Sequence, residues 1–169
     1  QSYVAQDQPA EGETLLRGVL ANNPTNRAAL LGLARLVAAR RDFAEAGRLL
    51  GDAEKAGARR EQLAIEWAML HVLAGDLAKG RIALEQLVEE RPDFVAAWTL
   101  LAGILLQQQD QKALAECERR LNRIRAKDFL AEVVKAQVAL SRDDIVAART
   151  CLDQALMLRP GNPTVLEQI

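Results

Sequence analysis

One spacing recurs along the chain and limits how it can fold. Aspartates are separated by 34 residues each time, at Asp42, Asp76, Asp110 and Asp144. Alanines follow the same period, at Ala34, Ala68, Ala102 and Ala136. Prolines recur at twice this distance, at Pro24, Pro92 and Pro160. A fixed period of this length is typical of repeat architectures. It predicts an incomplete block 1–26, complete blocks 27–60, 61–94, 95–128 and 129–162, and the start of a further block, 163–169.

Each block is predicted to form two antiparallel helices. In block 61–94 the first runs from about Glu61 to Leu73 and the second from about Leu77 to Glu90. Gly75 and the following Asp separate them, because glycine weakens a helix and aspartate caps the next one. Thirty Ala and 27 Leu residues favour helices, and β-branched and aromatic residues are too scarce for a sheet. The fold class is therefore expected to be all-α.

Two residues break the pattern of apolar positions. Glu118 falls where an apolar side chain is expected. The apolar residues nearby are Ala113, Cys117, Leu121 and Ile124. Their spacing predicts that the second helix of block 95–128 is displaced by one residue. Lys135 falls at another core position. We expect its aliphatic stem to lie on the core and its ammonium group to pair with Glu132, three residues earlier.

These columns resemble the tetratricopeptide repeat (TPR) family over essentially the whole chain. Trp98 stands in the family's Trp column, Leu33 and Leu101 in its Leu column, and Tyr3 in its Tyr column. The mid-repeat and later alanines and the prolines also match, at Ala46, Ala148, Ala53, Ala155, Pro24, Pro92 and Pro160. Alanine replaces the family's usual glycine in all four complete blocks, and His71 replaces an aromatic residue. The resemblance implies one domain over 1–169, a right-handed α-solenoid of antiparallel helix pairs.

In TPR proteins the first helix of each pair lines a concave groove. Carried onto this sequence, the groove residues are Leu31, Arg35, Gln62, Ile65, Met69, Val72, Thr99, Gly103, Leu106, Leu130, Val133 and Gln137. This mostly apolar set suggests a groove for an apolar or amphipathic helix or an extended segment, with Met69 as an adaptable contact. The alternative is a middle segment with a few exposed apolar side chains. The carboxylate clamp of some TPR domains is not matched, because its positions hold Leu31, Arg35, Glu66, Ala96 and Leu100.

Charge and composition restrict the other partners. Lys and Arg number 22 and Asp and Glu 23, a net charge of −1, which argues against a broad nucleic-acid surface. No apolar run approaches the ~18 residues of a membrane span. Val165, Leu166 and Ile169 lack a following helix to cover them, so we expect a longer parent protein and self-association through uncapped ends. No signal peptide is visible, and the compartment stays open between cytoplasm and periplasm.

The sequence offers little for catalysis. His71 is the sole imidazole and is expected to pack in the core, so we predict no metal, cofactor or catalytic residues. Cys117 and Cys151 are expected to be free thiols, because equivalent positions of adjacent repeats lie too far apart for a disulfide. The basic cluster around Arg119–Lys127 is attributed to a helix C-terminus.

Three functions fit this sequence. The first is a non-enzymatic protein-interaction scaffold that binds a peptide or helix in the groove. The second is a periplasmic spacer or assembly segment, similar to the TPR stretches of bacterial exopolysaccharide export or secretion systems. The third is the regulatory arm of a fused enzyme.

Overall fold

The computed structural model describes residues 4–124 and 128–160, with side chains from residue 10 onward. Over these ranges the chain forms nine α-helices and no strand. They group into two compact units, 1–83 and 84–169, whose boundary falls within α5 (Leu77–Glu90). None of the described helices is both long and apolar enough to cross a membrane.

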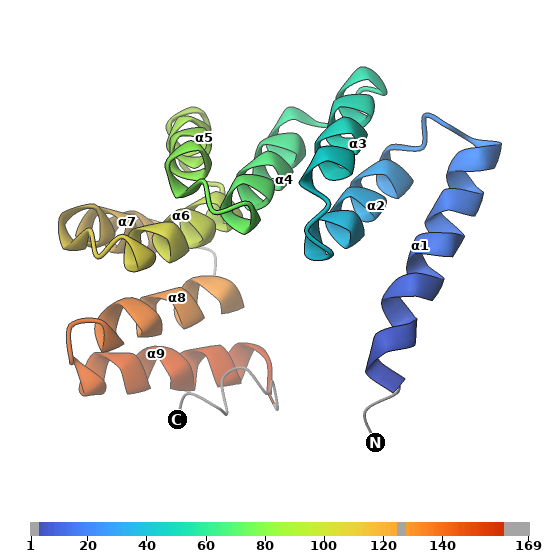
Figure 1. The fold of residues 1–169 in the computed structure, drawn as a ribbon. Helices are drawn as coiled ribbons and strands as arrows, with labels where there is room; N and C mark the ends of the chain where they lie inside the picture. Colours follow the sequence, from blue (N-terminus) through green and yellow to red (C-terminus); the bar gives the residue numbers. More distant parts are fainter. Residues whose placement is uncertain (1–3, 125–127, 161–169) are drawn as a thin grey trace. The chain divides into compact units, whose positions relative to one another are not determined.

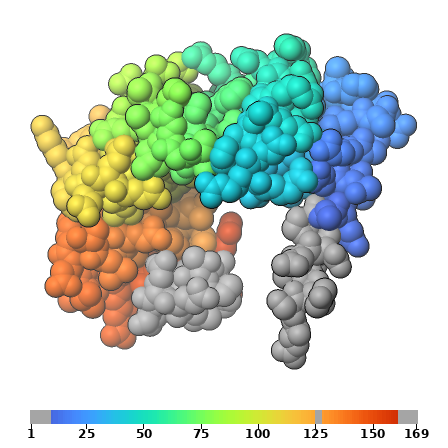
Figure 2. Space-filling model, viewed as in Figure 1, coloured from blue at the N-terminus to red at the C-terminus, as the bar shows by residue number. Residues whose placement is uncertain are grey.

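The first unit is built from α1 (Val4–Asn22), α2 (Arg27–Ala39), α3 (Phe43–Lys55), α4 (Arg60–Leu73) and the start of α5. Helix α2 packs on α1, α3 and α4, and α3 packs on α4 (Figure 1). Leu33 and Val37 of α2 and Leu50 and Ala53 of α3 are fully buried between these helices. The space-filling view shows the side chains of α3 and α4, coloured teal and green, packed into one surface (Figure 2).

The second unit holds the rest of α5 and four further helices, α6 (Val95–Gln107), α7 (Gln111–Arg123), α8 (Phe129–Leu140) and α9 (Ile145–Leu158). Helix α6 packs on α7, α8 packs on α9, and α8 also contacts α6 and α7. Each unit therefore contains antiparallel helix pairs in which the first helices, α2 and α4 or α6 and α8, lie next to each other. The fold class is all-α and solenoid-like, as the sequence predicts.

The turn inside each pair is the same backbone device, repeated every 34 residues. Arg41, Gly75, Gln109 and Asp143 have φ of 68°, 86°, 56° and 60°, in the left-handed region. The next residue in each turn is the periodic aspartate. Its N–H donates to the carbonyl five residues earlier, a helix-ending pattern that requires a left-handed residue before it. Only Gly75 adopts this conformation without cost from a Cβ atom.

The same aspartates begin the following helices. The side chains of Asp42, Asp76, Asp110 and Asp144 accept hydrogen bonds from the backbone N–H three residues later, at 3.0–3.1 Å. One residue therefore closes the preceding helix through its N–H and caps the following helix through its carboxylate. This confirms the predicted role of the aspartate column.

Helix α1 differs from the sequence-based expectation. The period places the start of the chain inside the first helix of an incomplete block, ahead of a second helix. The backbone instead runs as one helix from Val4 to Asn22. The position equivalent to the capping aspartates is Gln8, and glutamine is not among the side chains that favour helix N-caps. Tyr3 and the apolar residues Val165, Leu166 and Ile169 lie outside the described residues.

The alanine column explains how closely the paired helices approach. Ala34, Ala68, Ala102 and Ala136 are all 3% exposed or less. On the second helices Ala46 and Ala148 are equally buried, and Leu114 fills the corresponding place in α7. Small residues on facing helices let the larger leucines at their flanks interdigitate, which produces the dense packing of a protein interior.

The register of α7 corrects one prediction. Its buried residues are Leu114, Cys117 and Leu121, which lie 68 residues after the buried Ala46, Leu49 and Ala53 of α3. The helix is therefore not displaced by one residue. Glu118 keeps its regular position and is accommodated because its carboxylate reaches Arg142 Nη1 at 2.7 Å, with both side chains about one-third exposed. The ion pair with Arg142 therefore accommodates Glu118 without a shift in the register of α7.

Lys135 behaves as expected. Its Nζ lies 2.8 Å from Glu132 Oε1, and the two side chains are only 14% and 11% exposed. Glu132 occupies the position that Trp98 holds in the preceding block, where the indole donates to the Pro92 carbonyl at 3.0 Å. The second unit thus contains a charged pair at a place where the first helix of the preceding block has an aromatic ring.

Candidate functional site

The twelve predicted groove residues all lie on first helices. Two are on α2, four on α4, three on α6 and three on α8: Leu31 and Arg35; Gln62, Ile65, Met69 and Val72; Thr99, Gly103 and Leu106; Leu130, Val133 and Gln137. Since α2 contacts α4 and α6 contacts α8, each unit brings together residues from two first helices.

Their exposure is uneven. Leu31, Thr99 and Val133 are buried, at 3%, 9% and 6%, so their side chains offer little surface to a partner. Arg35, Met69 and Leu130 are exposed, and the remaining six are half-buried. In the first unit the exposed members gather on neighbouring turns of α2 and α4.

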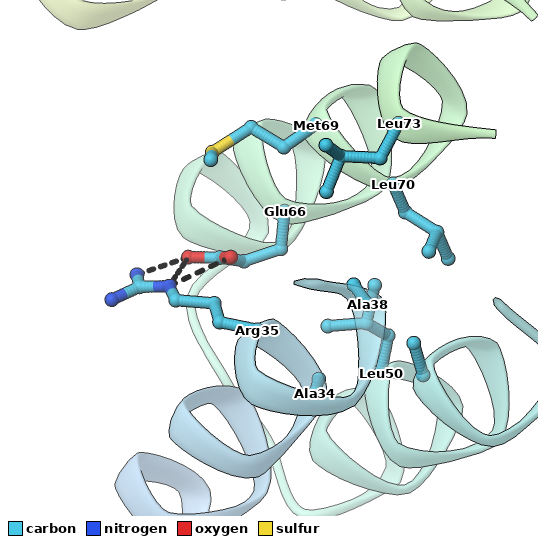
Figure 3. Close-up of a pocket in the computed structure, with 9 residues that line it drawn as sticks. Ala34, Arg35, Ala38, Leu50, Glu66, Met69, Leu70 and Leu73 are labelled. Atoms are coloured by element: carbon cyan, nitrogen blue, oxygen red, sulfur yellow. Dashed lines mark hydrogen bonds and ion pairs between the residues drawn. The ribbon is translucent and has the colours of Figure 1, made fainter. Parts of the chain in front are cut away.

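These residues border a small cavity, which we call the apolar hollow. It measures about 40 Å³, room for about three water molecules, and lies among α2, α3 and α4 (Figure 3). Its lining is Ala34, Arg35, Ala38, Ala46, Leu50, Glu66, Met69, Leu70 and Leu73. Met69 and Leu73 are 38% and 47% exposed, so the hollow opens to solvent beside two accessible apolar side chains of α4.

An ion pair forms the polar border of the apolar hollow. Arg35 Nε lies 2.8 and 2.9 Å from the two Glu66 carboxylate oxygens, and Nη2 also donates to Oε1. The Glu66 side chain is 3% exposed, whereas that of Arg35 is 55% exposed. The hydrogen bonds to Glu66 raise the pKa of Arg35, although partial burial opposes this. The third guanidinium nitrogen points away from the carboxylate (Figure 3).

Glu66 stands at a carboxylate-clamp position, and no role was predicted for it from the sequence. A signal was available, because Glu66 is a single acid between the apolar residues Leu63 and Leu70 of one first helix. An arginine on the preceding first helix is the natural partner for an acid that must be buried. The chain therefore joins two consecutive repeats through Arg35 and Glu66.

The residues considered as candidates for catalysis or metal binding are His71 and the two cysteines. The His71 ring stacks on Trp67, with centroids 6.2 Å apart and planes inclined by 29°. Both cysteines are free thiols; Cys117 is buried and Cys151 half-buried. Burial raises the pKa of Cys117 to about 12, with a smaller contribution from Glu116, so its nucleophilic thiolate is disfavoured. In the described part of the chain, no group of three or more His, Cys, Asp or Glu side chains could hold a metal ion.

Two arginines of the basic cluster form ion pairs with one glutamate of the same helix. Arg119 Nη2 and Arg120 Nε both lie 2.7 Å from the Glu116 carboxylate. The hydrogen bond from Arg120 lowers the pKa of Glu116, and the charges of Arg119, Arg120 and Arg123 act in the same direction. The rest of the cluster, Arg125 and Lys127, lies outside the described residues.

Comparisons with known proteins agree with this architecture. Two family models, each described as Tetratricopeptide repeat, match residues 3–65 and 65–128. A search of curated proteins gave no match. Among solved structures, a tetratricopeptide repeat protein from Parabacteroides merdae ATCC 43184 is similar with a TM-score of 0.83 and 12% identity, over 98% of this chain and 64% of that one.

Two other solved structures are similar at lower scores. YrrB, described as a TPR protein with an unusual peptide-binding site, gives a TM-score of 0.61 at 13% identity, over 97% of this chain and 84% of that one. MamA gives 0.59 at 12% identity, over 93% and 95%. At these identities the likeness concerns the fold alone.

Proposed function

The chain belongs to the tetratricopeptide repeat family, whose members bind protein or peptide partners, and we propose that it is an interaction scaffold that binds an apolar or amphipathic segment of a partner along its first helices. The observation that carries this proposal is the apolar hollow with Met69 and Leu73 exposed beside it. YrrB, similar in fold, is described as having a peptide-binding site, which is consistent with this use of the fold.

Recognition would combine apolar burial with one directed polar contact. An aliphatic side chain of the partner would enter the apolar hollow and cover Met69 and Leu73, each burial contributing about 1–2 kcal/mol. Arg35 is held in place by Glu66, and its remaining guanidinium nitrogen would donate to a backbone carbonyl of the partner. Because the arginine is already oriented, little side-chain entropy would be lost on binding.

We propose no catalytic role for this chain. The ion pair at the apolar hollow has a positional role, and the one imidazole stacks on an indole ring. No feature of the described residues favours the two alternatives, a periplasmic spacer of an export or secretion system and the regulatory arm of a fused enzyme.

A peptide-display selection on the intact chain tests the proposal. Selected peptides would be measured by isothermal titration on the wild type, on Met69→Glu and on the matched control Met157→Glu, whose methionine is 80% exposed on α9. We expect apolar peptides to bind the wild type and the control alike and to lose at least tenfold affinity on Met69→Glu. Equal affinity for all three proteins would refute the hollow as the binding site.

A further inference from the structure

A second cavity lies where α2 and α4 begin, and we call it the arginine pocket. It has a volume of about 500 Å³ and is contained within the first unit. Its lining is Asn23, Thr25, Asn26, Arg27, Ala28, Leu31, Ala58, Arg59 and Gln62. It is therefore formed mainly by the turns that precede two consecutive first helices, and it is far more polar than the apolar hollow.

The charge of this pocket is unbalanced. Two arginines line it and no carboxylate does. Arg27 Nη1 donates to the Gly57 carbonyl at 3.0 Å, which fixes its guanidinium group across the two turns without neutralising it. Arg59 makes no side-chain capping bond, and within the described part of the chain it has no ion-pair partner. Two positive charges at one concave site, in a chain of net charge −1, favour an anion.

The arginine pocket continues the predicted groove. Leu31 and Gln62 belong both to its lining and to the groove residues, and Ala38 at the far end of α2 lines the apolar hollow. Eleven residues of helix separate Arg27 from Ala38, about 16 Å at 1.5 Å per residue. An extended peptide covers that distance with about five residues. One partner segment could therefore reach both cavities.

We propose that the arginine pocket binds an acidic side chain, Asp or Glu, of the same partner segment whose apolar side chain occupies the hollow; this rests on the proposed function. Arg27 keeps further guanidinium N–H groups besides the one that it gives to Gly57, and a side-chain carboxylate accepts paired N–H groups through its two oxygens. Phosphoserine is the rival anion that the test below includes. Arg27 is the first residue of α2 and Arg59 directly precedes α4, so both arginines lie outside the positions of the carboxylate clamp. The partner is thus an acidic–apolar segment with about five residues between the two features.

Synthetic peptides of defined composition test this. Each is acetylated and amidated, so that the only carboxylates are on side chains, and carries two Leu and two Glu separated by five Ser and Gly residues, in either order. Matched peptides replace Glu by Gln or by phosphoserine. Binding is followed by amide chemical shifts of the ¹⁵N-labelled chain at 50 and 500 mM NaCl. The variants are Arg59→Glu, Arg27→Gln, Met69→Glu and the control Arg149→Glu, an exposed arginine of α9.

We expect the Glu peptide to bind about tenfold more tightly than the Gln peptide at 50 mM NaCl, and this preference to vanish at 500 mM. Arg59→Glu should abolish the preference and Arg27→Gln should reduce it, whereas Arg149→Glu should leave it unchanged. Shifts at the Arg59 and Gln62 amides should accompany binding. Circular dichroism of each variant checks that it is folded.

The outcomes separate the two proposals. If Met69→Glu weakens both peptides but Glu and Gln peptides bind alike, the arginine pocket is overturned and the scaffold function stands. If Arg59→Glu abolishes the preference while Met69→Glu has no effect, the pocket is supported and the hollow is refuted. A phosphoserine peptide that binds at least tenfold more tightly than the Glu peptide overturns the choice of carboxylate. No binding of any peptide overturns both.

Discussion

The ion pair between Arg35 and Glu66 leads to a quantitative prediction about stability. Replacing Arg35 by Met keeps an apolar stem of similar length but leaves the Glu66 carboxylate, 3% exposed, without its partner. Breaking a fully buried pair costs about 3–5 kcal/mol, whereas exposed pairs contribute about 0–1 kcal/mol. Because the Arg35 side chain is 55% exposed, water reaches one side of the pair. We therefore expect Arg35→Met to lower the free energy of unfolding by about 2 kcal/mol.

A double-mutant cycle isolates the interaction. Arg35→Met, Glu66→Met and the double variant would be unfolded in urea, with Trp67 fluorescence in a Trp98→Phe background, so that the readout comes from α4. The double variant should be close to the wild type in stability, because apolar replacement removes both charges together. The coupling energy should then be about 2 kcal/mol or slightly more.

An exposed pair on the same unit provides the control. Arg48 Nη1 lies 3.0 Å from Asp52 Oδ2 on α3, with side chains 62% and 35% exposed. The same cycle on this pair should give about 0.5 kcal/mol or less. A coupling energy for Arg35 and Glu66 no larger than that of the control would refute the reasoning that burial of one partner makes this ion pair strong.

Four further predictions concern the backbone and the thiols. Gly75→Ala should destabilise the chain by about 1 kcal/mol in urea unfolding, because its φ is 86° even though a Cβ would meet nothing within 4 Å. Gly51 is equally open but lies inside α3, so Gly51→Ala should stabilise the chain by about 0.5–1 kcal/mol. Changes of the same sign in both variants would contradict this reasoning. Asp144→Ala should cost about 1 kcal/mol in the same assay by removing the cap of α9, and no change would refute its capping role. In the folded chain at pH 8, Ellman's reagent should modify Cys151 but not Cys117. Burial raises the pKa of Cys117 to about 12 in the folded chain, so the protonated thiol contributes its full stability below pH ~9. This contribution falls by about 1.4 kcal/mol per pH unit as the pH rises toward 12. Above pH ~9 the free energy of unfolding in urea should therefore fall more steeply for the wild type than for Cys117→Ala, and parallel pH dependences would contradict the shift.

The period of 34 was sufficient to predict the helices of the complete blocks. For α4 and α5 the predicted bounds, about Glu61–Leu73 and Leu77–Glu90, agree with the observed ones to within a residue. The reason is that apolar periodicity and the aspartate caps specify the same boundaries. The left-handed conformations of Arg41 and Gln109 could not be predicted, because neither residue type favours them and the surrounding repeat imposes them.

The candidate site could be predicted from the sequence less completely than the helix boundaries. The positions of groove residues follow from helix periodicity, but their exposure depends on how the surrounding helices cover them. Leu31 and Val133 are buried, and Val133 packs in a cluster with Leu152 and Ala155 of α9. The predicted register of α7 was wrong, because Glu118 keeps its regular position and its carboxylate accepts a hydrogen bond from Arg142, 24 residues later. The arginine pocket draws residues from two turns a block apart, a juxtaposition that single-block comparison does not reveal.

The two buried acids differ in how they would behave if this gene region were duplicated or shuffled. Glu132 carries its counter-ion on the same helix, three residues away, so its hairpin can be copied to a new place without stranding a charge. Glu66 depends on an arginine supplied by the preceding hairpin. Moving either of those two hairpins alone would leave an uncompensated carboxylate inside the protein, so a rearrangement that keeps the protein stable would have to move them together and in the same order.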